Sequence, residues 1–240
     1  MSGGVFISKG MQVGVPAGGI KIWFDDKGEL QSSLRLQVHF NVVPTWIDLA
    51  LRHLAVSKCD CDTRTKAWAD NDENEKGRSL EQEFCSSMQA IMSAAVAFDA
   101  FYASLRDRVQ VDPRILAKWR DNRTARYKQV AEVIRIAFNL KPRGTAALRQ
   151  NLRAIFKLRD LAVHPDPKLT DPVLHPELQV GVEWRFFHFR FQEALTVVRS
   201  AVYMLHELAT NGKPANAAVE EYAAALKPWL DEFKENVCLK

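Results

Sequence analysis

Apolar and polar side chains alternate near the start of the chain. Apolar residues occupy positions 34, 36, 38 and 40, and polar residues separate them. Because a period of two is typical of a half-buried strand, this run predicts a β-strand that ends before Pro44. An earlier apolar run at positions 20, 22 and 24 precedes the turn-type sequence Asp25–Gly28, which predicts a β-hairpin. With a short helix over residues 46–56, residues 1–57 are predicted to form a hairpin-plus-helix appendage.

From residue 79 onward the apolar spacing changes to three and four, which indicates amphipathic helices. Residues 58–78 are polar and charged, and they predict a loop between the appendage and a helical domain over residues 79–240. Ser79 and Gln82 fit a capping box, so the first helix of this domain is expected to begin there. Further helices are predicted over residues 113–140, 146–163, 189–210 and 214–236. The predicted fold class is mainly α, a helical bundle with a small β-rich N-terminal segment.

The composition is that of an ordinary folded protein. The 240 residues are 47% hydrophobic and 26% charged, which excludes an intrinsically disordered chain. A net charge of +4 permits a polyanionic partner without requiring one. The four cysteines, at positions 59, 61, 85 and 238, form no Cys-x-x-Cys pair, and reduced thiols are favoured over a zinc site. No metal or cofactor is expected.

The N-terminus lacks the charged and apolar regions of a signal peptide. The most apolar window, Ala90–Phe98, is shorter than the roughly 20 residues that span a bilayer. A cytoplasmic protein without membrane contact is therefore expected.

An arginine interrupts the apolar stripe of the helix at 146–163. Leu148, Leu152, Ile155, Arg159 and Ala162 follow one another at spacings of four and three, so Arg159 stands where a leucine would be expected. A buried guanidinium is costly unless it is paired or reaches an opening. Either Arg159 serves a site, or its stem packs while its head reaches water or a carboxylate.

A histidine follows at the end of the same helix. Proline disfavours the α conformation in the residue before it, so the helix is expected to end at His164, directly before Pro165. An unwound last turn can swing the imidazole back toward Arg159. Asp160, four residues before His164, either holds one ring nitrogen of the histidine or forms a surface ion pair with a lysine.

The bare pattern Arg-x(4–6)-His has little specificity. With 18 arginines and six histidines in the chain, on the order of one chance match is expected, and the sequence contains two. The second match, Arg199 and His206, lies within a predicted helix and is typical of an ordinary helix face. Only the first match lies at a helix terminus, followed by a proline-rich break.

The segment Leu-Arg-Asp-Leu-Ala-Val-His-Pro at positions 158–165 resembles the signature of the HEPN superfamily (higher eukaryotes and prokaryotes nucleotide-binding). The alanine-rich segment at 95–102, with an acid and aromatic residues, is similar to a segment upstream of that signature in many members. The resemblance covers roughly residues 79–210 and leaves residues 1–57 outside. It implies an all-α bundle that usually forms a homodimer, in which two Arg–His pairs meet in one cleft. Many members are metal-independent endoribonucleases.

The resemblance also implies residue roles. Arg159 would bind the scissile phosphate of an RNA, and His164 would act as general acid or base, with Asp160 beside them. Asp99 would be an acidic neighbour at the substrate. The chain departs from the HEPN toxins that are paired with a nucleotidyltransferase: they carry a tyrosine two positions after the histidine, where Asp166 stands here. Control by adenylylation of that tyrosine is therefore not expected.

Two further features bear on RNA binding. Arg149, Arg153 and Lys157 recur every four residues and can follow an RNA backbone, although such a run is also typical of a solvated helix face. Aromatic residues between 184 and 191 can stack on bases or pack in a core. Three hypotheses remain open: an RNA-cleaving HEPN toxin or defence effector with an antitoxin or other partner protein, a non-catalytic HEPN-like binding or assembly module, and a helical interaction domain whose motif is accidental.

Overall fold

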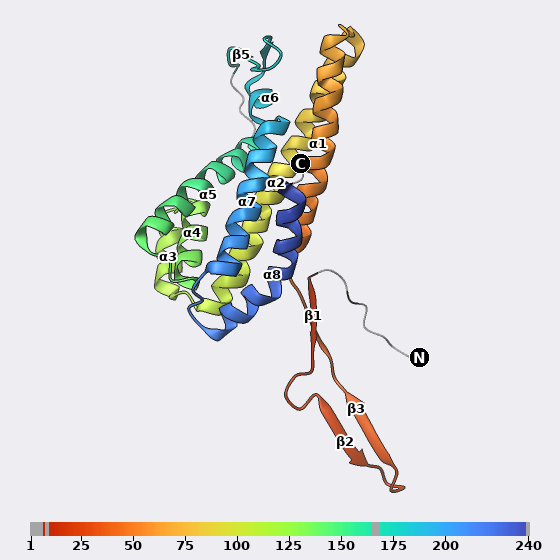
Figure 1. The fold of residues 1–240 in the computed structure, drawn as a ribbon. Coiled ribbons are helices and arrows are strands. Elements are labelled where there is room, and N and C mark those ends of the chain that lie inside the picture. Colours follow the sequence, from red (N-terminus) through yellow and green to blue (C-terminus); the bar gives the residue numbers. More distant parts are fainter. Residues whose placement is uncertain (1–6, 8–9, 165–168, 239–240) are drawn as a thin grey trace.

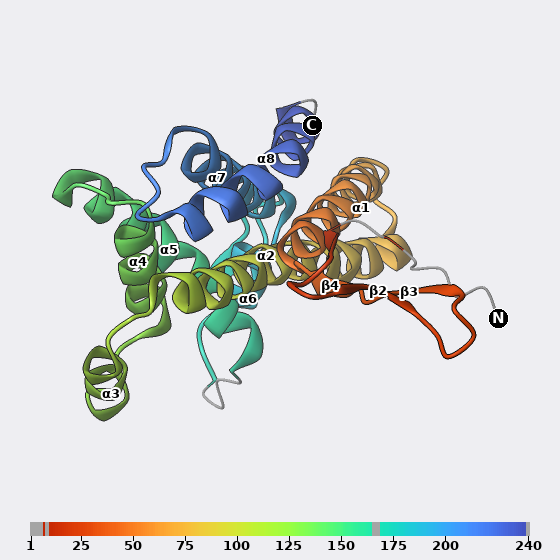
Figure 2. The same cartoon turned by 90° about the horizontal axis from the view of Figure 1, so that it is seen from below.

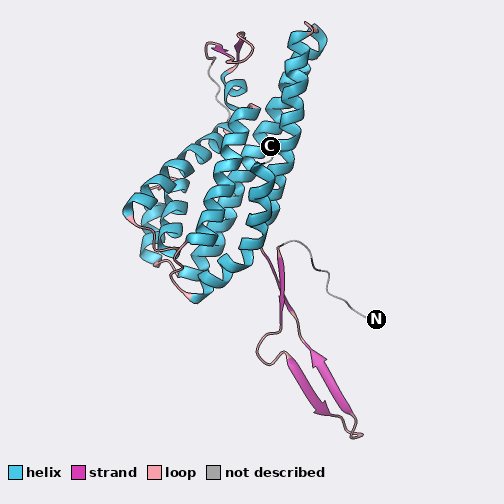
Figure 3. Cartoon of the chain, in the orientation of Figure 1, coloured by secondary structure: helices cyan, strands magenta, loops and turns pink. Residues whose placement is uncertain are grey.

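Helices form the body of the molecule, and a narrow β arm extends from it (Figure 1; Figure 3). The computed structural model describes residues 7, 10–164 and 169–238. The prediction of a mainly α fold with a small β-rich N-terminal segment is confirmed. The helices are α1 (Val43–Ala69), α2 (Glu73–Val109), α3 (Pro113–Asp121), α4 (Arg126–Ala137), α5 (Pro142–Val163), α6 (Trp184–His188), α7 (Phe191–Asn211) and α8 (Ala217–Cys238).

Helix α2 is the centre of the bundle. It packs against α1, α4, α5, α7 and α8, and small buried residues such as Ala90, Ala94 and Ala97 allow the neighbouring helices to approach closely. The side chain of Asp72 caps its N-terminus by accepting hydrogen bonds from the amides of Asn74 (3.1 Å) and Glu75 (3.2 Å). Among the described helices, α2 alone is long and apolar enough to span a membrane by length and composition, and 56% of that apolar window is buried within the bundle.

The predicted loop over residues 58–78 is wrong. Helix α1 continues to Ala69 and α2 begins at Glu73, so the expected boundary between appendage and helical domain falls inside a pair of packed helices. The buried stripe of α1 continues beyond Leu54 at helical spacing through Ser57, Arg64 and Ala67, which are small or charged rather than large and apolar. The expected capping box is wrong for the same reason: Ser79 lies inside α2, and its hydroxyl donates to the carbonyl of Glu75.

The β arm, residues 10–42, consists of two successive antiparallel ribbons. Strand β1 (Met11–Gly14) pairs with β4 (Gln37–Phe40), and β2 (Ile20–Phe24) pairs with β3 (Leu30–Leu34). The Asp25 carboxylate accepts from the amides of Lys27 and Glu29, both at 2.9 Å, and fixes the turn. The second strand of the hairpin is β3 and not the predicted run over residues 34–40, whose later part pairs with β1 as β4, whereas the predicted turn and the strand before it are confirmed. The expected burial of one face is not, because the side chains of β2, β3 and β4 are almost all exposed.

The arm and the helices α3, α4 and α5 lie on opposite sides of the bundle. Both views place α3, α4 and α5 on one side of α2, and α1 with the arm on the other (Figure 1; Figure 2). A third small ribbon, β5 (Val173–Leu174) with β6 (Gly181–Val182), lies in the segment between α5 and α6. This segment connects the end of α5, where the Arg–His motif lies, to the rest of the bundle.

Candidate functional site

The motif lies at the C-terminal end of α5. Leu148, Leu152 and Ile155 bury one side of this helix in the core, as the stripe predicts. The helix ends at Val163, and His164 has an extended backbone (φ −102°, ψ 116°) while its amide donates to the carbonyl of Asp160 at 3.0 Å. The predicted helix end before Pro165 is therefore confirmed. Pro165 and Asp166 themselves lie outside the described residues.

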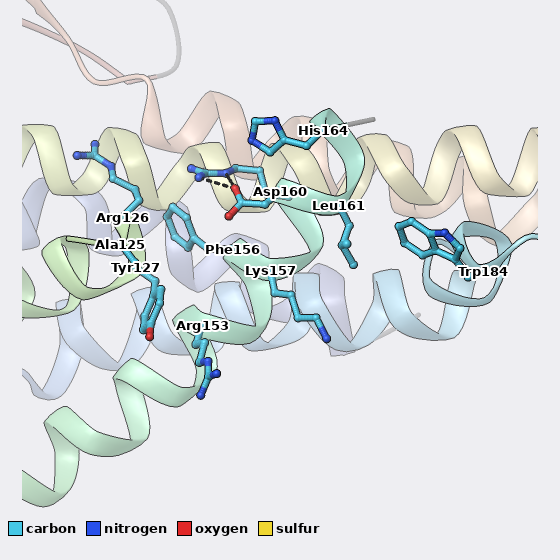
Figure 4. A pocket seen from close by; sticks show the side chains of 11 residues that line it. Ala125, Arg126, Tyr127, Arg153, Phe156, Lys157, Asp160, Leu161, His164 and Trp184 are labelled. Carbon is cyan, nitrogen blue, oxygen red and sulfur yellow. Dashed lines mark hydrogen bonds and ion pairs between the residues drawn. The ribbon is translucent and has the colours of Figure 1, made fainter. Parts of the chain in front are cut away.

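Arg159, Asp160 and His164 line one open cavity of about 620 Å³. Its other walls come from the start of α4, the outer face of α5 and the start of α6, as Figure 4 shows. Of the basic residues that the sequence singles out, Arg153 and Lys157 line the same cavity, whereas Arg149 lines a different one near the start of α5. The structure thus brings five of the six predicted site residues to one cavity wall.

Arg159 is held by two carboxylates. Its Nη1 donates to Asp99 at 2.9 Å, and its Nε and Nη2 donate to Asp160 at 3.1 and 2.8 Å. The guanidinium also lies over the ring of Phe156, with 4.4 Å between its carbon and the ring centroid. The contacts agree with the interpretation in which the head of Arg159 meets a carboxylate, and the side chain also lines the cavity with 20% of its surface exposed.

Asp99, from the middle of α2, is the sixth predicted residue. It is not among the residues that line the cavity. Its Oδ2 accepts from Arg159 and its Oδ1 accepts from Nε of Arg126 at 2.6 Å. One carboxylate therefore binds the guanidinium groups of two arginines that line the cavity.

Arg126 is the residue that sequence reasoning missed. It begins α4, stacks over the ring of Tyr102 at 3.9 Å, and lines the cavity. Its only signal in the sequence is a place in the polar stretch at 120–129, and nothing there links it to Asp99, 27 residues earlier. With Arg153, Lys157 and Arg159 it gives the cavity four positive charges, against the carboxylates of Asp160 and the adjacent Asp99.

The ring of His164 is exposed and faces the same cavity (Figure 4). Within the described part of the chain, no side chain hydrogen-bonds to the ring, and the Asp160 carboxylate accepts from Arg159 instead. The expected support of the imidazole by Asp160 is therefore not formed there, since Asp160 and Arg159 are neighbours whose side chains meet at the helix surface.

The aromatic cluster after residue 183 divides between two environments. Phe186 and Phe189 pack on Phe84 of α2, with ring centroids 4.9 and 5.7 Å apart. Trp184 instead lines the cavity, together with Tyr127 on the α4 side. Aromatic side chains thus line the cavity on its α4 side and on its α6 side.

The second Arg–His match serves the fold. His206 contacts Asp231 of α8 (Nε2 to Oδ1, 3.0 Å), and Nε of Arg199 donates to the carbonyl of Val237 at 3.2 Å. Both residues fasten α7 to α8, which agrees with the prediction of an ordinary helix face.

The segment that follows the motif is anchored by a buried charge cluster. Arg64 of α1, which is almost fully buried, pairs with Glu83 of α2 and with Glu177, and Glu177 also accepts from Arg190 at 3.0 Å. His175 is buried beside them, and burial together with the charge of Arg64 lowers its pKa. The cluster ties the chain after the motif to the tops of α1 and α2.

This cluster predicts a pH dependence of stability. Burial raises the pKa of Glu177, but the hydrogen bonds and charges of Arg64 and Arg190 outweigh it and hold that pKa below its ordinary value of 4.5. Since the folded pKa lies below the unfolded one, the stabilisation is complete above about pH 4.5 and is lost as the pH falls further. Thermal unfolding from pH 3 to 7 is expected to show this loss, and Glu177→Gln is expected to reduce it. A Glu177→Gln protein with an unchanged pH profile would contradict the assignment.

The three cysteines whose side chains the structure describes form no disulfide. Cys59, Cys61 and Cys85 are free thiols, and burial, reinforced by the charge of Glu83, raises the pKa of Cys61 to about 11. Among the described residues, no three His, Cys, Asp or Glu side chains gather as metal ligands would. In comparisons with known proteins, no family model, no curated protein and no solved structure matches the chain.

Proposed function

We propose that the protein is an endoribonuclease of the HEPN type that cleaves RNA without a metal ion. The observation that carries the proposal is that Arg159 and His164 share one open cavity with three further basic side chains. Four cationic groups against two carboxylates favour a phosphate-containing ligand. The proposal extends to a cytoplasmic toxin or defence effector that acts as a homodimer under the control of a partner protein.

The ion pairs of Arg159 leave room for a phosphate. A guanidinium has five N–H donors, and the contacts with Asp99 and Asp160 use three of them. Two N–H groups remain for an oxygen of the scissile phosphate, where they would stabilise the negative charge that develops during cleavage. Asp99 and Asp160 fix the plane of the guanidinium, so little rotamer freedom is lost when the substrate binds.

His164 supplies the proton transfer. Imidazole exchanges protons near neutral pH, and an exposed ring at the cavity can reach a ribose. As general base it would take the proton of the 2′-hydroxyl while the 2′-oxygen attacks phosphorus. The bond to the 5′-oxygen then breaks, that oxygen takes up a proton from water, and the imidazolium of His164 returns its proton to the solvent. The products are a 2′,3′-cyclic phosphate end and a 5′-hydroxyl end.

The proposal is tested by incubating the full chain with 5′-labelled RNA in EDTA. We expect fragments that end in a 2′,3′-cyclic phosphate, and we expect His164→Ala to abolish them. His206→Ala is the matched control, because it removes the histidine of the second motif match and leaves the cavity intact. Intact RNA at excess protein, or equal cleavage by His164→Ala, would contradict the proposal.

A non-catalytic module is the second candidate, and the pairing of Arg159 favours it. Arg159 pairs with Asp99 and Asp160, and its pair with Asp99 can hold α5 against α2 without any substrate. Under this alternative the cavity binds RNA or a partner without cleaving it, and His164→Ala leaves that binding unchanged. RNA that binds in a filter assay and stays intact would favour this candidate.

A further inference from the structure

The positive charge of the chain is concentrated in one part of the molecule. Residues 113–163 contain 13 Lys and Arg residues against three acids, a net charge of +10, whereas the rest of the chain carries a net charge of −6. These residues form α3, α4 and α5, which lie together on one side of α2 and are here called the basic lobe (Figure 1; Figure 2). A one-sided positive field of this size attracts a polyanion.

Most cations of the basic lobe are available to a ligand. Four of its arginines pair with acidic side chains: Arg114, Arg126, Arg135 and Arg159. The other nine Lys and Arg side chains are exposed and form no ion pair within the described residues, among them Arg120, Arg123, Arg149, Arg153 and Lys157. Their charge is therefore free to be matched by the phosphate groups of a ligand.

The basic lobe has no apolar patch beside these charges. No large apolar side chain between residues 113 and 162 is exposed. A protein interface is centred on aromatic and aliphatic anchors, and a helix that lies on a membrane inserts an apolar face. A nucleic-acid backbone needs neither, because Lys and Arg contacts with its phosphates supply much of the affinity. The lobe therefore matches a phosphodiester backbone better than an acidic protein or a lipid surface.

One row of free cations leads away from the Arg159 cavity along α5. Lys157 and Arg153 line the cavity, and Arg149 follows one turn closer to the start of the helix, outside the cavity. Residues four apart lie on nearly the same side of a helix and about 6 Å apart along its axis. The row therefore continues the positive cavity wall over the outer surface of α5.

A second group of free cations lies on the α3 side of the cavity. Arg126 lines the cavity as the first residue of α4, and Arg123 precedes it by three residues, which span at most about 11 Å. Arg123 has a left-handed backbone (φ 46°), and its amide donates to the carbonyl of Arg120 at 3.1 Å. This tight turn keeps the end of α3, with Arg120, next to the cavity.

We propose that the basic lobe is a second binding surface for RNA, on which the strand continues beyond the cavity. Arg149 binds its phosphates on the α5 side, and Arg120 and Arg123 bind them on the α3 side. The proposal rests on the proposed function, because that function places the RNA backbone in the cavity. It implies that the substrate is a strand longer than the cavity can hold.

Fluorescence anisotropy of labelled RNA tests the lobe. The protein is the full chain with His164→Ala, in EDTA, so that the RNA stays intact. Arg120→Gln with Arg149→Gln is expected to weaken binding of an RNA of about 16 nucleotides by roughly tenfold at physiological salt. The slope of log affinity against log salt is expected to fall by about 1.4, since each contact with a single strand contributes about 0.7. A trinucleotide that fills only the cavity is expected to lose no affinity.

The matched control is Arg52→Gln with Lys66→Gln. It removes two exposed cations from α1, on the other side of α2, and binding is expected to stay unchanged. Circular dichroism checks that both double variants keep their helices. DNA of the same sequence is expected to bind more weakly, since it lacks the 2′-hydroxyl that the proposed cleavage uses.

Three results would overturn the assignment of the lobe: equal losses in the two double variants, tighter binding of DNA, or binding to vesicles that contain phosphatidylserine in place of RNA. The outcome is separable from the proposed function. If the unsubstituted protein leaves RNA intact while binding depends on Arg120 and Arg149, only the nuclease proposal fails. If it cleaves RNA while the Arg120→Gln/Arg149→Gln protein binds as before, only the lobe fails.

Discussion

Arg159→Ala is expected to lower the rate of RNA cleavage by about two to three orders of magnitude, the usual cost of removing a donor that stabilises transition-state charge. The fold is expected to survive. Asp99 keeps its hydrogen bond to Arg126 in this variant, and the lost pair is partly exposed, so the free energy of unfolding falls by only about 1 kcal/mol. Single-turnover cleavage and urea unfolding of the same preparations measure both effects.

Arg159→Lys separates charge from geometry. A lysine keeps the positive charge, but its three donors cannot replace a planar guanidinium that spends three N–H groups on Asp99 and Asp160 and keeps two for a phosphate, so an intermediate rate is expected. Arg153→Ala is the control: Arg153 is an exposed residue at the same cavity, and its loss is expected to weaken RNA binding slightly and to reduce its salt dependence. Unchanged cleavage by Arg159→Ala would refute the role of this residue. A loss of several kcal/mol in stability would instead identify it as structural.

Arg64→Ala is expected to destabilise the protein by about 3–5 kcal/mol, because it leaves the buried carboxylate of Glu83 without a counter-charge. Glu83 keeps one contact in this variant, the amide of Phe191 at 3.0 Å, which does not neutralise it. Urea unfolding followed by circular dichroism measures the loss.

Two controls belong to this measurement. Lys58→Ala removes an exposed ion pair with Asp62 on the same helix, and no measurable change is expected. Arg64→Ala combined with Glu83→Gln is expected to recover part of the lost stability, since the buried negative charge is then gone as well. A loss below about 1 kcal/mol for Arg64→Ala alone would show that water reaches Glu83 and that the pair is not a buried one.

The local elements were predictable where sequence pattern and local chemistry agree. The stripe through Leu148, Leu152 and Ile155, together with Pro165, defines α5 and its end. The Asp25–Gly28 turn defines the hairpin, because its hydrogen bonds involve only nearby residues. Both predictions rest on interactions within a few residues along the chain.

The helical run through residues 58–69 was not predictable in the same way. Its buried positions carry Arg64 instead of a large apolar residue, and the guanidinium is tolerated there only because Glu83 and Glu177 converge on it from other elements. The spacing of apolar residues does not reveal a buried position when a paired charged residue occupies it.

The sequence predicted most of the residues that lie at the candidate site, but it did not predict which of them contact each other. The helix end places Arg159 and His164 near each other, and this follows from local geometry. The bridge from Arg126 through Asp99 to Arg159 joins α4, α2 and α5, and Arg159 lies 60 residues beyond Asp99. Which carboxylate meets which arginine is decided by how these helices pack, which the sequence pattern does not encode.

Helix α2 contributes one carboxylate to each of two charged clusters. Glu83 pairs with Arg64, and Asp99 pairs with Arg126 and Arg159. Glu83 and Asp99 lie 16 residues apart on it, about 24 Å at 1.5 Å per residue. Free-energy changes at positions so far apart generally add without coupling. Substitutions near Arg64 can therefore lower the free energy of unfolding while the residues of the Arg159 cavity stay in place. Substitutions in the cavity can in turn remove its charged groups and leave the free energy of unfolding nearly unchanged. The proposed RNA cleavage can therefore be lost during evolution while the protein remains folded.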